Sequence, residues 1–284
     1  MGVNTKIEWA THSWNPWTGC TKIDPGCKHC YMDRWAKRVG RDPKEVRRSS
    51  RPTFDAPLKW ARGVLTFNDA GGPITNAVEA NDLIFTCSLS DFYHEDADPW
   101  REEAFKIIES TPFQYLILTK RPERILDWHG VNSWHVGGIP LLTRPIPSNV
   151  WLGVSISDTK GLWRLDELVK IPAAIRWISF EPILSRIRFD GSQIHKLDTQ
   201  IKWIITGGES GPGCRPFVPQ NALEIIKICQ LYGIPCYHKQ NGATKKIGGT
   251  WGGDELHGKT YKDYPEFKAD RAVHPIQDND LFGG

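Results

Sequence analysis

Three cysteines lie close together near the start of the chain. Cys20, Cys27 and Cys30 are separated by six and then two residues, in the stretch Gly-Cys-Thr-Lys-Ile-Asp-Pro-Gly-Cys-Lys-His-Cys-Tyr. Three thiolates on one loop can hold three corners of a [4Fe–4S] cluster and leave the fourth iron without a protein ligand. The amino and carboxylate groups of S-adenosylmethionine (SAM) can chelate that iron, and one-electron reduction then releases a 5′-deoxyadenosyl radical. The spacing therefore predicts an iron–sulfur cluster with SAM as its second cofactor.

Two other interpretations of these cysteines stay open on spacing alone. A structural zinc ion could be held by the three thiolates together with His29 or His12, and three unrelated thiols are also compatible with the pattern. The position of the motif favours the cluster, because the motif follows a predicted strand and precedes a predicted helix that begins at Tyr31. It thus lies on a loop at the carboxyl end of a strand, which is the face that carries the active site in β/α barrels.

The elements that must position this loop alternate along the chain. Six short apolar segments, rich in β-branched and aromatic residues, predict buried strands at 82–87, 114–118, 150–154, 174–178, 201–205 and 235–238. Helical patterns lie around and between them, at 31–39, 99–110, 122–128, 162–170 and 219–232. Adding a strand before the first cysteine gives about seven strands in βαβ succession. The fold class is therefore predicted to be α/β, a partial (β/α)6–7 barrel with the cluster loop after its first strand.

Two segments stand apart from this alternation. Residues 40–81 are rich in Arg, Pro and Gly and are predicted to form an inserted arm within a barrel domain of residues 1–241. Residues 242–284 form a polar, Gly-rich tail that is expected to cover one end of the barrel. Between Arg34 and Arg62 there are ten Lys/Arg and three Asp/Glu. This local excess of positive charge predicts contact with phosphates, with a solvated helix face as the alternative.

The composition is that of an ordinary globular protein, with 284 residues, 39% hydrophobic and 24% charged. No apolar run approaches the ~18 residues of a membrane span, and the first fifteen residues lack the layout of a signal peptide. The seven cysteines are odd in number, which argues against a disulfide framework. We therefore expect a cytoplasmic protein without membrane contact.

Eight short motifs, in the same order, resemble a phage- and bacteria-associated three-cysteine family that is regarded as radical-SAM-like and has no settled common substrate. They are Trp14–Cys20, Pro25–Tyr31, Cys87–Asp91, Leu118–Pro122, Trp151–Ser155, Ser179–Pro182, Gly207–Gly211 and Lys239-Gln240. A more distant likeness to spore photoproduct lyase, a radical SAM enzyme of DNA repair, lies in the Cys-x-x-Cys-Tyr end of the motif and in a Lys after the third strand. The first gap between cysteines is longer here than in the common radical SAM motif, and the turn signal Asp24-Pro25-Gly26 could absorb the extra residues.

The polar residues that follow the predicted strands are the candidate site, because such residues build the site of a β/α barrel. Lys120 is assigned to the SAM carboxylate, with Arg121 as the second choice for that cation. Glu181 and Glu209 follow neighbouring strands, so one could bind the ammonium or ribose of SAM while the other binds substrate or moves a proton. The alternative for Glu181 is an ion pair inside the barrel with Lys239.

The remaining candidates have narrower roles. Further contacts to SAM are predicted for Ser88, Ser90, Ser155 and Gly208, the glycine because it permits close backbone approach. Contacts to substrate are predicted for Asp91, Arg121, Arg215, Lys239 and Gln240. Cys214 lies in a Gly-rich loop beside Arg215 and could donate a hydrogen atom to a product radical, the alternative being an incidental thiol.

Taken with the resemblance, these features predict a radical SAM enzyme of the isomerase, lyase or transferase type. The basic stretch and the family's phage association favour a nucleic-acid base as substrate, in modification, rearrangement or repair of phage DNA. An electron donor such as flavodoxin or ferredoxin would reduce the cluster. Two alternatives are a radical SAM enzyme that modifies a peptide or small molecule, and a non-catalytic, zinc-stabilised nucleic-acid-binding protein.

Overall fold

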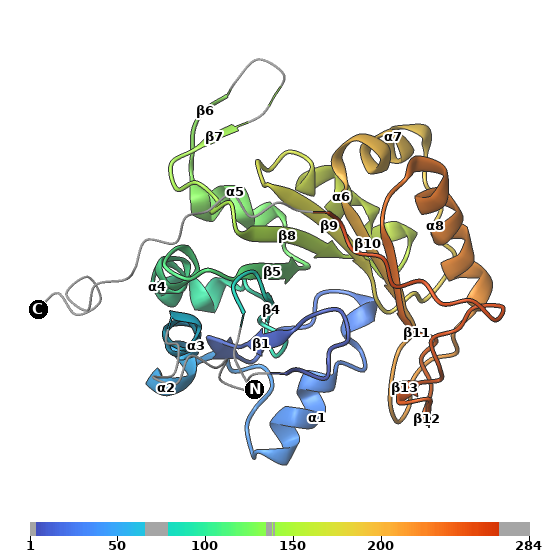
Figure 1. Cartoon of the computed structure of the whole chain (residues 1–284), viewed down its shortest axis with the longest axis horizontal. Helices are drawn as coiled ribbons and strands as arrows, with labels where there is room; N and C mark the ends of the chain where they lie inside the picture. Colours follow the sequence, from blue (N-terminus) through green and yellow to red (C-terminus); the bar gives the residue numbers. More distant parts are fainter. Residues whose placement is uncertain (1–3, 66–78, 135–137, 139, 267–284) are drawn as a thin grey trace, which may run out of the picture.

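A computed structural model describes residues 4–65, 79–134, 138 and 140–266. Its main sheet has seven strands in the order β1-β4-β5-β8-β9-β10-β11, and every neighbouring pair is parallel. The strands are β1 (His12–Trp14), β4 (Leu83–Thr86), β5 (Gln114–Thr119), β8 (Val150–Ser155), β9 (Ile175–Phe180), β10 (Trp203–Gly207) and β11 (Cys236–Gln240). The sheet curls into a half-barrel (Figure 1), so the prediction of an α/β fold with a partial barrel is confirmed.

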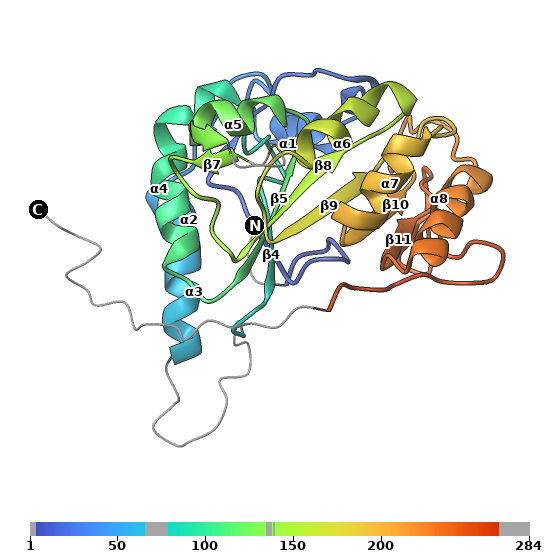
Figure 2. The ribbon, with the colours of Figure 1, turned by 90° about the horizontal axis from the view of Figure 1, so that it is seen from above.

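Helices cover the convex face of this sheet. Figures 1 and 2 show α4 to α8 arranged around the outside of the strands. The long helices are α1 (Tyr31–Arg38), α3 (Ala56–Leu65), α4 (Asp98–Glu109), α7 (Gly191–Gln200) and α8 (Pro219–Tyr232), and the short ones are α2 (Arg51–Phe54), α5 (Glu123–His129) and α6 (Trp163–Leu168), with 3-10 turns η1 (Pro25–Cys27), η2 (Glu95–Ala97) and η3 (Thr159–Leu162). No helix in the described ranges is long and apolar enough to cross a membrane.

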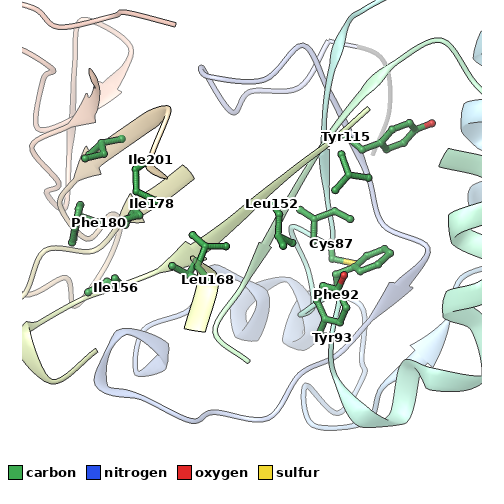
Figure 3. Packing of buried hydrophobic residues seen from close by; sticks show 14 of the residues in the cluster. Cys87, Phe92, Tyr93, Tyr115, Leu152, Ile156, Leu168, Ile178, Phe180 and Ile201 are labelled. Atoms are coloured by element: carbon green, nitrogen blue, oxygen red, sulfur yellow. The ribbon is translucent and has the colours of Figure 1, made fainter. Parts of the chain in front are cut away.

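Each strand presents alternate residues to two different cores, as a pleated strand must. Toward the helices, residues such as Leu152 and Ile178 pack into one large apolar cluster, part of which is shown in Figure 3. On the opposite, inner face of the half-barrel, Trp151, Trp177 and Trp203 form a second cluster. The half-barrel therefore encloses an aromatic inner layer rather than an open channel.

The amino-terminal segment closes this inner layer from one end. The ring of Trp9 meets Phe85, Trp177 and Trp203 edge-on, with centroid separations of 4.5, 5.6 and 6.3 Å. The tail reaches the same place, because Tyr264 packs on Trp203 at 5.3 Å. The amino end of the half-barrel is thus filled with aromatic rings, and its carboxyl end carries the polar residues.

Segment 40–65 belongs to the body of the fold rather than to a projecting arm. The two-residue strand β3 (Arg47–Arg48) pairs antiparallel with β2 (Trp17–Thr18). Phe54 is fully buried, and α3 packs against α4. The remainder of the predicted arm, residues 66–78, lies outside the described residues.

Two hairpins complete the described chain. One joins β6 (Val131–Trp134) to β7 (Pro140–Leu142), and the other joins β12 (Lys246–Ile247) to β13 (Thr250–Trp251). Beyond the second hairpin, Lys262 forms a β-bridge with Tyr237 of β11, and the Asp263 backbone carbonyl accepts a hydrogen bond from the Trp203 indole at 2.9 Å. The described part of the tail therefore packs along β11 and toward the amino end of the barrel, while residues 267–284 lie outside the described residues.

Candidate functional site

The loop that carries the three cysteines lies over the carboxyl ends of the parallel strands. Three arginines fasten it there, one from each of the segments that follow β5, β8 and β10. Arg121 donates to the Thr21 carbonyl at 3.1 Å, Arg164 donates to the Asp24 carboxylate at 2.8 Å, and Arg215 donates to the Pro25 carbonyl at 2.9 Å. The loop thus spans the edge of the half-barrel at which the candidate polar residues were expected.

The extra residues between the first two cysteines form a tight turn. The Asp24 carboxylate accepts the Gly26 amide at 2.8 Å and so begins η1, with Pro25 in its first turn. A Cβ on Gly26 would lie 2.2 Å from the Ser157 hydroxyl, so only glycine lets the turn sit this close to the end of β8. The predicted Asp-Pro-Gly turn is therefore present, and it brings the loop down onto the sheet.

The three thiols share one partly buried region. Cys20 and Cys30 both pack against a small apolar cluster that contains Met32 and Leu89. Burial and, to a smaller extent, Asp91 raise the pKa of Cys20 to about 12, although the nearby Arg121 opposes the shift. Burial also raises the pKa of Cys30, and Cys27 lies close enough to both thiols to add to these shifts. Thiolates at these positions therefore need a positively charged group, which bound iron would supply.

One of the two histidines considered as a fourth zinc ligand, His12, lies away from the cysteine loop. That histidine lies at the amino end of β1, where one ring nitrogen pairs with Asp82 at 2.8 Å and the other accepts the Asn4 amide at 3.0 Å. His29, the other zinc candidate, lies near Gly213 of the loop after β10. No group of three or more His, Cys, Asp or Glu in the described ranges is arranged around one metal ion. In a [4Fe–4S] cluster each thiolate binds a different iron, so the three sulfurs need not converge on one point.

Lys120 and Ser155 form the centre of the polar edge. The Lys120 ammonium donates to the Ser155 hydroxyl and lies 3.8 Å from the Asp24 carboxylate of the cysteine loop. The Ser155 hydroxyl donates in turn to the Glu181 carbonyl at 3.2 Å. These contacts bring the ends of β5, β8 and β9 together beneath the loop. The contacts to SAM expected of Lys120 and Ser155 stay predictions.

Glu181 makes the ion pair that was its alternative assignment. Its carboxylate lies 3.2 Å from the Lys239 ammonium, and the two side chains are 14% and 24% exposed. The pair links β9 to β11 across Gly207 of β10, where a Cβ would stand 2.8 Å from the Glu181 oxygen. Both charges therefore remain at the edge of the inner face and accessible to solvent.

Glu209 is bound differently, because Arg215 surrounds its carboxylate. The Arg215 backbone amide and Nε donate to it at 2.9 and 3.0 Å, and a further guanidinium nitrogen pairs with its other oxygen. Burial opposes ionisation, but the hydrogen bonds and charge of Arg215 hold the pKa of Glu209 below its usual range. Since Arg215 also binds the cysteine loop, Glu209 joins the β10 loop to that loop.

Several other candidates serve the structure of the edge. Asp91 is 5% exposed and accepts from four donors, namely the Thr119 hydroxyl, the Tyr93 and Lys120 amides and the Arg121 guanidinium, at 2.6 to 3.2 Å. The hydroxyls of Ser88 and Ser90 bond to Asn15 and to the Gly19 carbonyl, and so hold the chain that leads into the first cysteine. These contacts occupy the groups that the sequence had assigned to SAM and substrate.

Gly208 and Gln240 bond to each other. The Gly208 amide donates to the Gln240 carbonyl at 2.9 Å, and the space that a Gly208 Cβ would need is taken by the Asn241 carbonyl at 1.9 Å. The close approach predicted at this glycine is therefore to the protein's own backbone. Cys214 is half-buried in a turn closed by its amide on the Gly211 carbonyl, in the same loop whose Gly213 lies near His29.

Part of the basic stretch is paired within the fold. Arg48 and Arg51 both bind Glu103 of α4 at 2.7 Å, and Arg47 pairs with Glu45. On and after α1, which directly follows the third cysteine, Lys37, Arg38 and Lys44 are exposed. The positive surface available to a partner is therefore narrower than the sequence predicted and lies beside the cysteine loop.

Sequence reasoning gave no part in holding the loop on the sheet to two residues that do so, Asp24 and Arg164. A signal for the first was present, since Asp before Pro-Gly is a typical turn-capping residue. Arg164 gave no signal, because its helical position resembles a solvent-facing one, yet its side chain is only 4% exposed. It also donates to the Lys120 carbonyl at 2.9 Å, and so ties the loop, α6 and the end of β5 together.

Comparison with known proteins gives a family without an assigned activity. No curated protein and no solved structure is similar enough to this chain to count as a match. A protein family of unknown function (DUF5131) matches residues 4–265, a range that includes the cysteine loop, all seven strands of the half-barrel and the β12–β13 hairpin. On that match, this chain is a member of the DUF5131 family.

Proposed function

We propose that this chain is a radical SAM enzyme whose [4Fe–4S] cluster is held by Cys20, Cys27 and Cys30. The observation that carries the proposal is the placement of the three-cysteine loop on the carboxyl ends of β5, β8 and β10, directly beside Lys120. Bound there, a [4Fe–4S] cluster with one open iron would supply the electron for the reductive cleavage of SAM to methionine and a 5′-deoxyadenosyl radical, the species that would abstract hydrogen from the substrate. The resemblance of eight motifs to a radical-SAM-like family supports the same assignment.

The methionyl group of SAM carries a carboxylate and an ammonium, and the inner edge offers a partner to each. Lys120 is 17% exposed and its ammonium already lies between a hydroxyl and a carboxylate, so it suits the SAM carboxylate. Glu181 suits the ammonium, and Lys239 balances its charge when no ligand is bound. Lys120 and Glu181 can bind SAM without breaking a full set of hydrogen bonds. Asp91 and Glu209 cannot, because several donors already bind their carboxylates.

The aromatic inner layer suits the chemistry of a carbon radical. Water and mobile polar groups quench or divert reactive intermediates, so such a site must be closed. Trp9, Trp177 and Trp203 are each at most 2% exposed and fill the half-barrel below the polar edge. We assign to them the exclusion of solvent from the amino end of the site.

We further propose that the substrate is a base in nucleic acid, which the enzyme modifies, rearranges or repairs. Support comes from the exposed cations Lys37, Arg38 and Lys44 beside the cysteine loop. A phosphate backbone bound along α1 would place a base near the polar edge. An electron donor of the flavodoxin or ferredoxin type completes the reaction.

Iron content tests the cluster. Anaerobic reconstitution should give about four irons per chain, and Cys27→Ala should lose most of them. Cys229→Ala is the matched control, because that thiol is buried in α8 away from the loop. Stoichiometric zinc without iron would overturn the proposal in favour of a zinc-stabilised protein.

SAM binding tests the assignment of Lys120. With iron retained, Lys120→Met should weaken binding of SAM in calorimetry by roughly tenfold or more, since a charge-assisted hydrogen bond contributes about 1.5–3 kcal/mol. Lys160→Met removes an exposed charge from η3 and should leave the affinity unchanged. Equal affinity in both variants would refute the role of Lys120.

The salt dependence of DNA binding tests the substrate class. Affinity should fall steeply as salt rises, with a log–log slope of about −0.9 for each phosphate contact. The double variant Lys37→Ala/Arg38→Ala should make that slope shallower, whereas Arg186→Ala on an exposed segment after β9 should not. A flat salt response in the wild-type protein would exclude a nucleic-acid substrate bound along α1.

A further inference from the structure

Arg121 lies between the cysteine loop and the end of β5, and its guanidinium is held on several sides. One terminal nitrogen, Nη1, is 3.7 Å from the Cys20 sulfur and 3.2 Å from the Asp91 carboxylate. The other, Nη2, donates to the Thr21 hydroxyl at 2.7 Å and to the Thr21 carbonyl at 3.1 Å. The side chain is 5% exposed, so the guanidinium is fixed in one orientation with an N–H directed at a loop thiol.

The planar fork of arginine explains this choice of residue. A guanidinium presents five N–H donors in a rigid arrangement, whereas an ammonium is a single point of charge. Only the fork can satisfy Asp91, both Thr21 acceptors and the Cys20 sulfur together. With these partners in place, Arg121 has little capacity left for a SAM carboxylate or a substrate, the roles that the sequence had predicted for it.

Hydrogen bonds to the sulfurs of an iron–sulfur cluster are one of the means by which a protein sets its reduction potential. The added electron increases the negative charge of the cluster, so an N–H donor at a thiolate favours the reduced form. Burial strengthens this effect, because the local dielectric is low. Asp91 acts in the opposite direction, since its negatively charged carboxylate lies 3.2 Å from the same Nη1 that contacts Cys20 and disfavours added negative charge there.

We propose that Arg121 raises the reduction potential of the cluster through its N–H···S hydrogen bond to Cys20, and that Asp91 limits the increase. This inference rests on the proposed function, since it requires the cluster. Arg121 is thus a positioning and tuning residue that acts through Cys20. Arg121 also lines an open cleft of about 430 Å³ outside the loop. The Cys20 sulfur is therefore separated from solvent in this cleft by the Arg121 side chain, and a one-electron donor can approach from that side.

The test is an anaerobic redox titration of the reconstituted protein, followed by electron paramagnetic resonance of the reduced cluster. Arg121→Gln should shift the midpoint potential to a more negative value. Asp91→Asn should shift it to a more positive value. Arg124→Gln is the matched control, because this neighbouring arginine binds Asp98 and the Tyr93 carbonyl rather than the loop, and it should leave the potential unchanged.

Shifts of the midpoint potential in opposite directions distinguish tuning from a merely structural role. If the two residues only held the loop in shape, both variants would bind less iron, and their potentials would not move in opposite directions. If Arg121→Gln fails to hold iron, Thr21→Val tests the same point, because it removes one acceptor that orients the guanidinium and should give a smaller negative shift. Iron-loaded variants with the wild-type potential would overturn the inference and leave the proposed function standing. A wild-type protein that takes up no iron would overturn both.

Discussion

The buried ion pair between Asp24 and Arg164 offers the sharpest test of how the cysteine loop is held. The two groups are 2.8 Å apart, and their side chains are 10% and 4% exposed. Asp24→Asn preserves the shape of the side chain and can still accept the Gly26 amide. The substitution therefore removes the charge while leaving the turn's own hydrogen bond possible.

The magnitude follows from what remains around Arg164. Removing one partner of a buried pair costs about 3–5 kcal/mol, because the other charge stays buried without compensation. Arg164 keeps two backbone acceptors, the Lys120 and Ser155 carbonyls at 2.9 and 3.3 Å, which places the loss near the lower end of that range. We expect the free energy of unfolding to fall by about 3 kcal/mol.

The chain supplies a matched control with a similar distance and different burial. Arg186 and Glu224 are 2.7 Å apart, but their side chains are 61% and 29% exposed. Glu224→Gln should therefore cost less than about 1 kcal/mol. Urea unfolding of both variants and the wild type at pH 7, with unchanged m-values, gives the comparison. Equal losses in the two variants would refute the reasoning that burial, rather than pairing, fixes the loop.

Two further predictions concern the body of the fold. Burial lowers the pKa of His129 and of His238 to about 4, from an ordinary value near 6.5, so the unfolded chain binds more protons between these values. Keeping the two histidines neutral in the fold therefore costs nothing above about pH 6.5, but the free energy of unfolding decreases as the pH falls toward 4. The expected decrease is about 2 kcal/mol per histidine between pH 7 and 5. Urea midpoints at the two pH values measure this, and a His129→Gln variant with the same pH dependence as wild type would contradict it. Gly153→Ala should cost about 1–3 kcal/mol by overpacking, because the new methyl would lie 2.4 Å from the Trp177 ring; an unchanged melting temperature would show that the inner layer is looser than described.

The strands were predictable because each is a short apolar segment followed by polar residues, and tertiary contacts reinforce that pattern. Two groups of helices could not be predicted from the sequence in this way. Helix α7 has few apolar residues, and its clearest signal is the capping box of Asp190 with Gln193. Helices α2 and α3 lie in a stretch whose arginines and prolines indicate a loop. There Pro52 lies in the first turn of α2, a position at which proline favours a helix.

The location of the candidate site was predictable for a similar reason, and its inner connections were not. Parallel strands bring all their carboxyl ends to one edge, so the cysteine loop and the polar strand ends had to meet. The sequence did not show which polar residues bind other parts of the protein, because their partners lie far away in the chain. Asp24 and Arg164 are 140 residues apart, and Cys20 and Arg121 are 101 apart.

A period of two could nevertheless have divided the candidates. Residues an even number of positions after an inner-face aromatic or aliphatic residue point into the half-barrel. Trp177 is thus followed on the same face by Glu181, Tyr237 by Lys239, and Trp151 by Ser155. These are the candidates whose charges and hydroxyls remain at the inner edge, and with Lys120, two places after Leu118, they form the set we assign to ligands. Arg121 and Gln240, one position out of phase, instead bind the cysteine loop and the neighbouring strand. Glu209 is also in phase, four places after Ile205, but Arg215 binds its carboxylate. Alternation therefore shows which candidates face the reaction space, and long-range contacts decide which of them the protein uses to hold the cysteine loop.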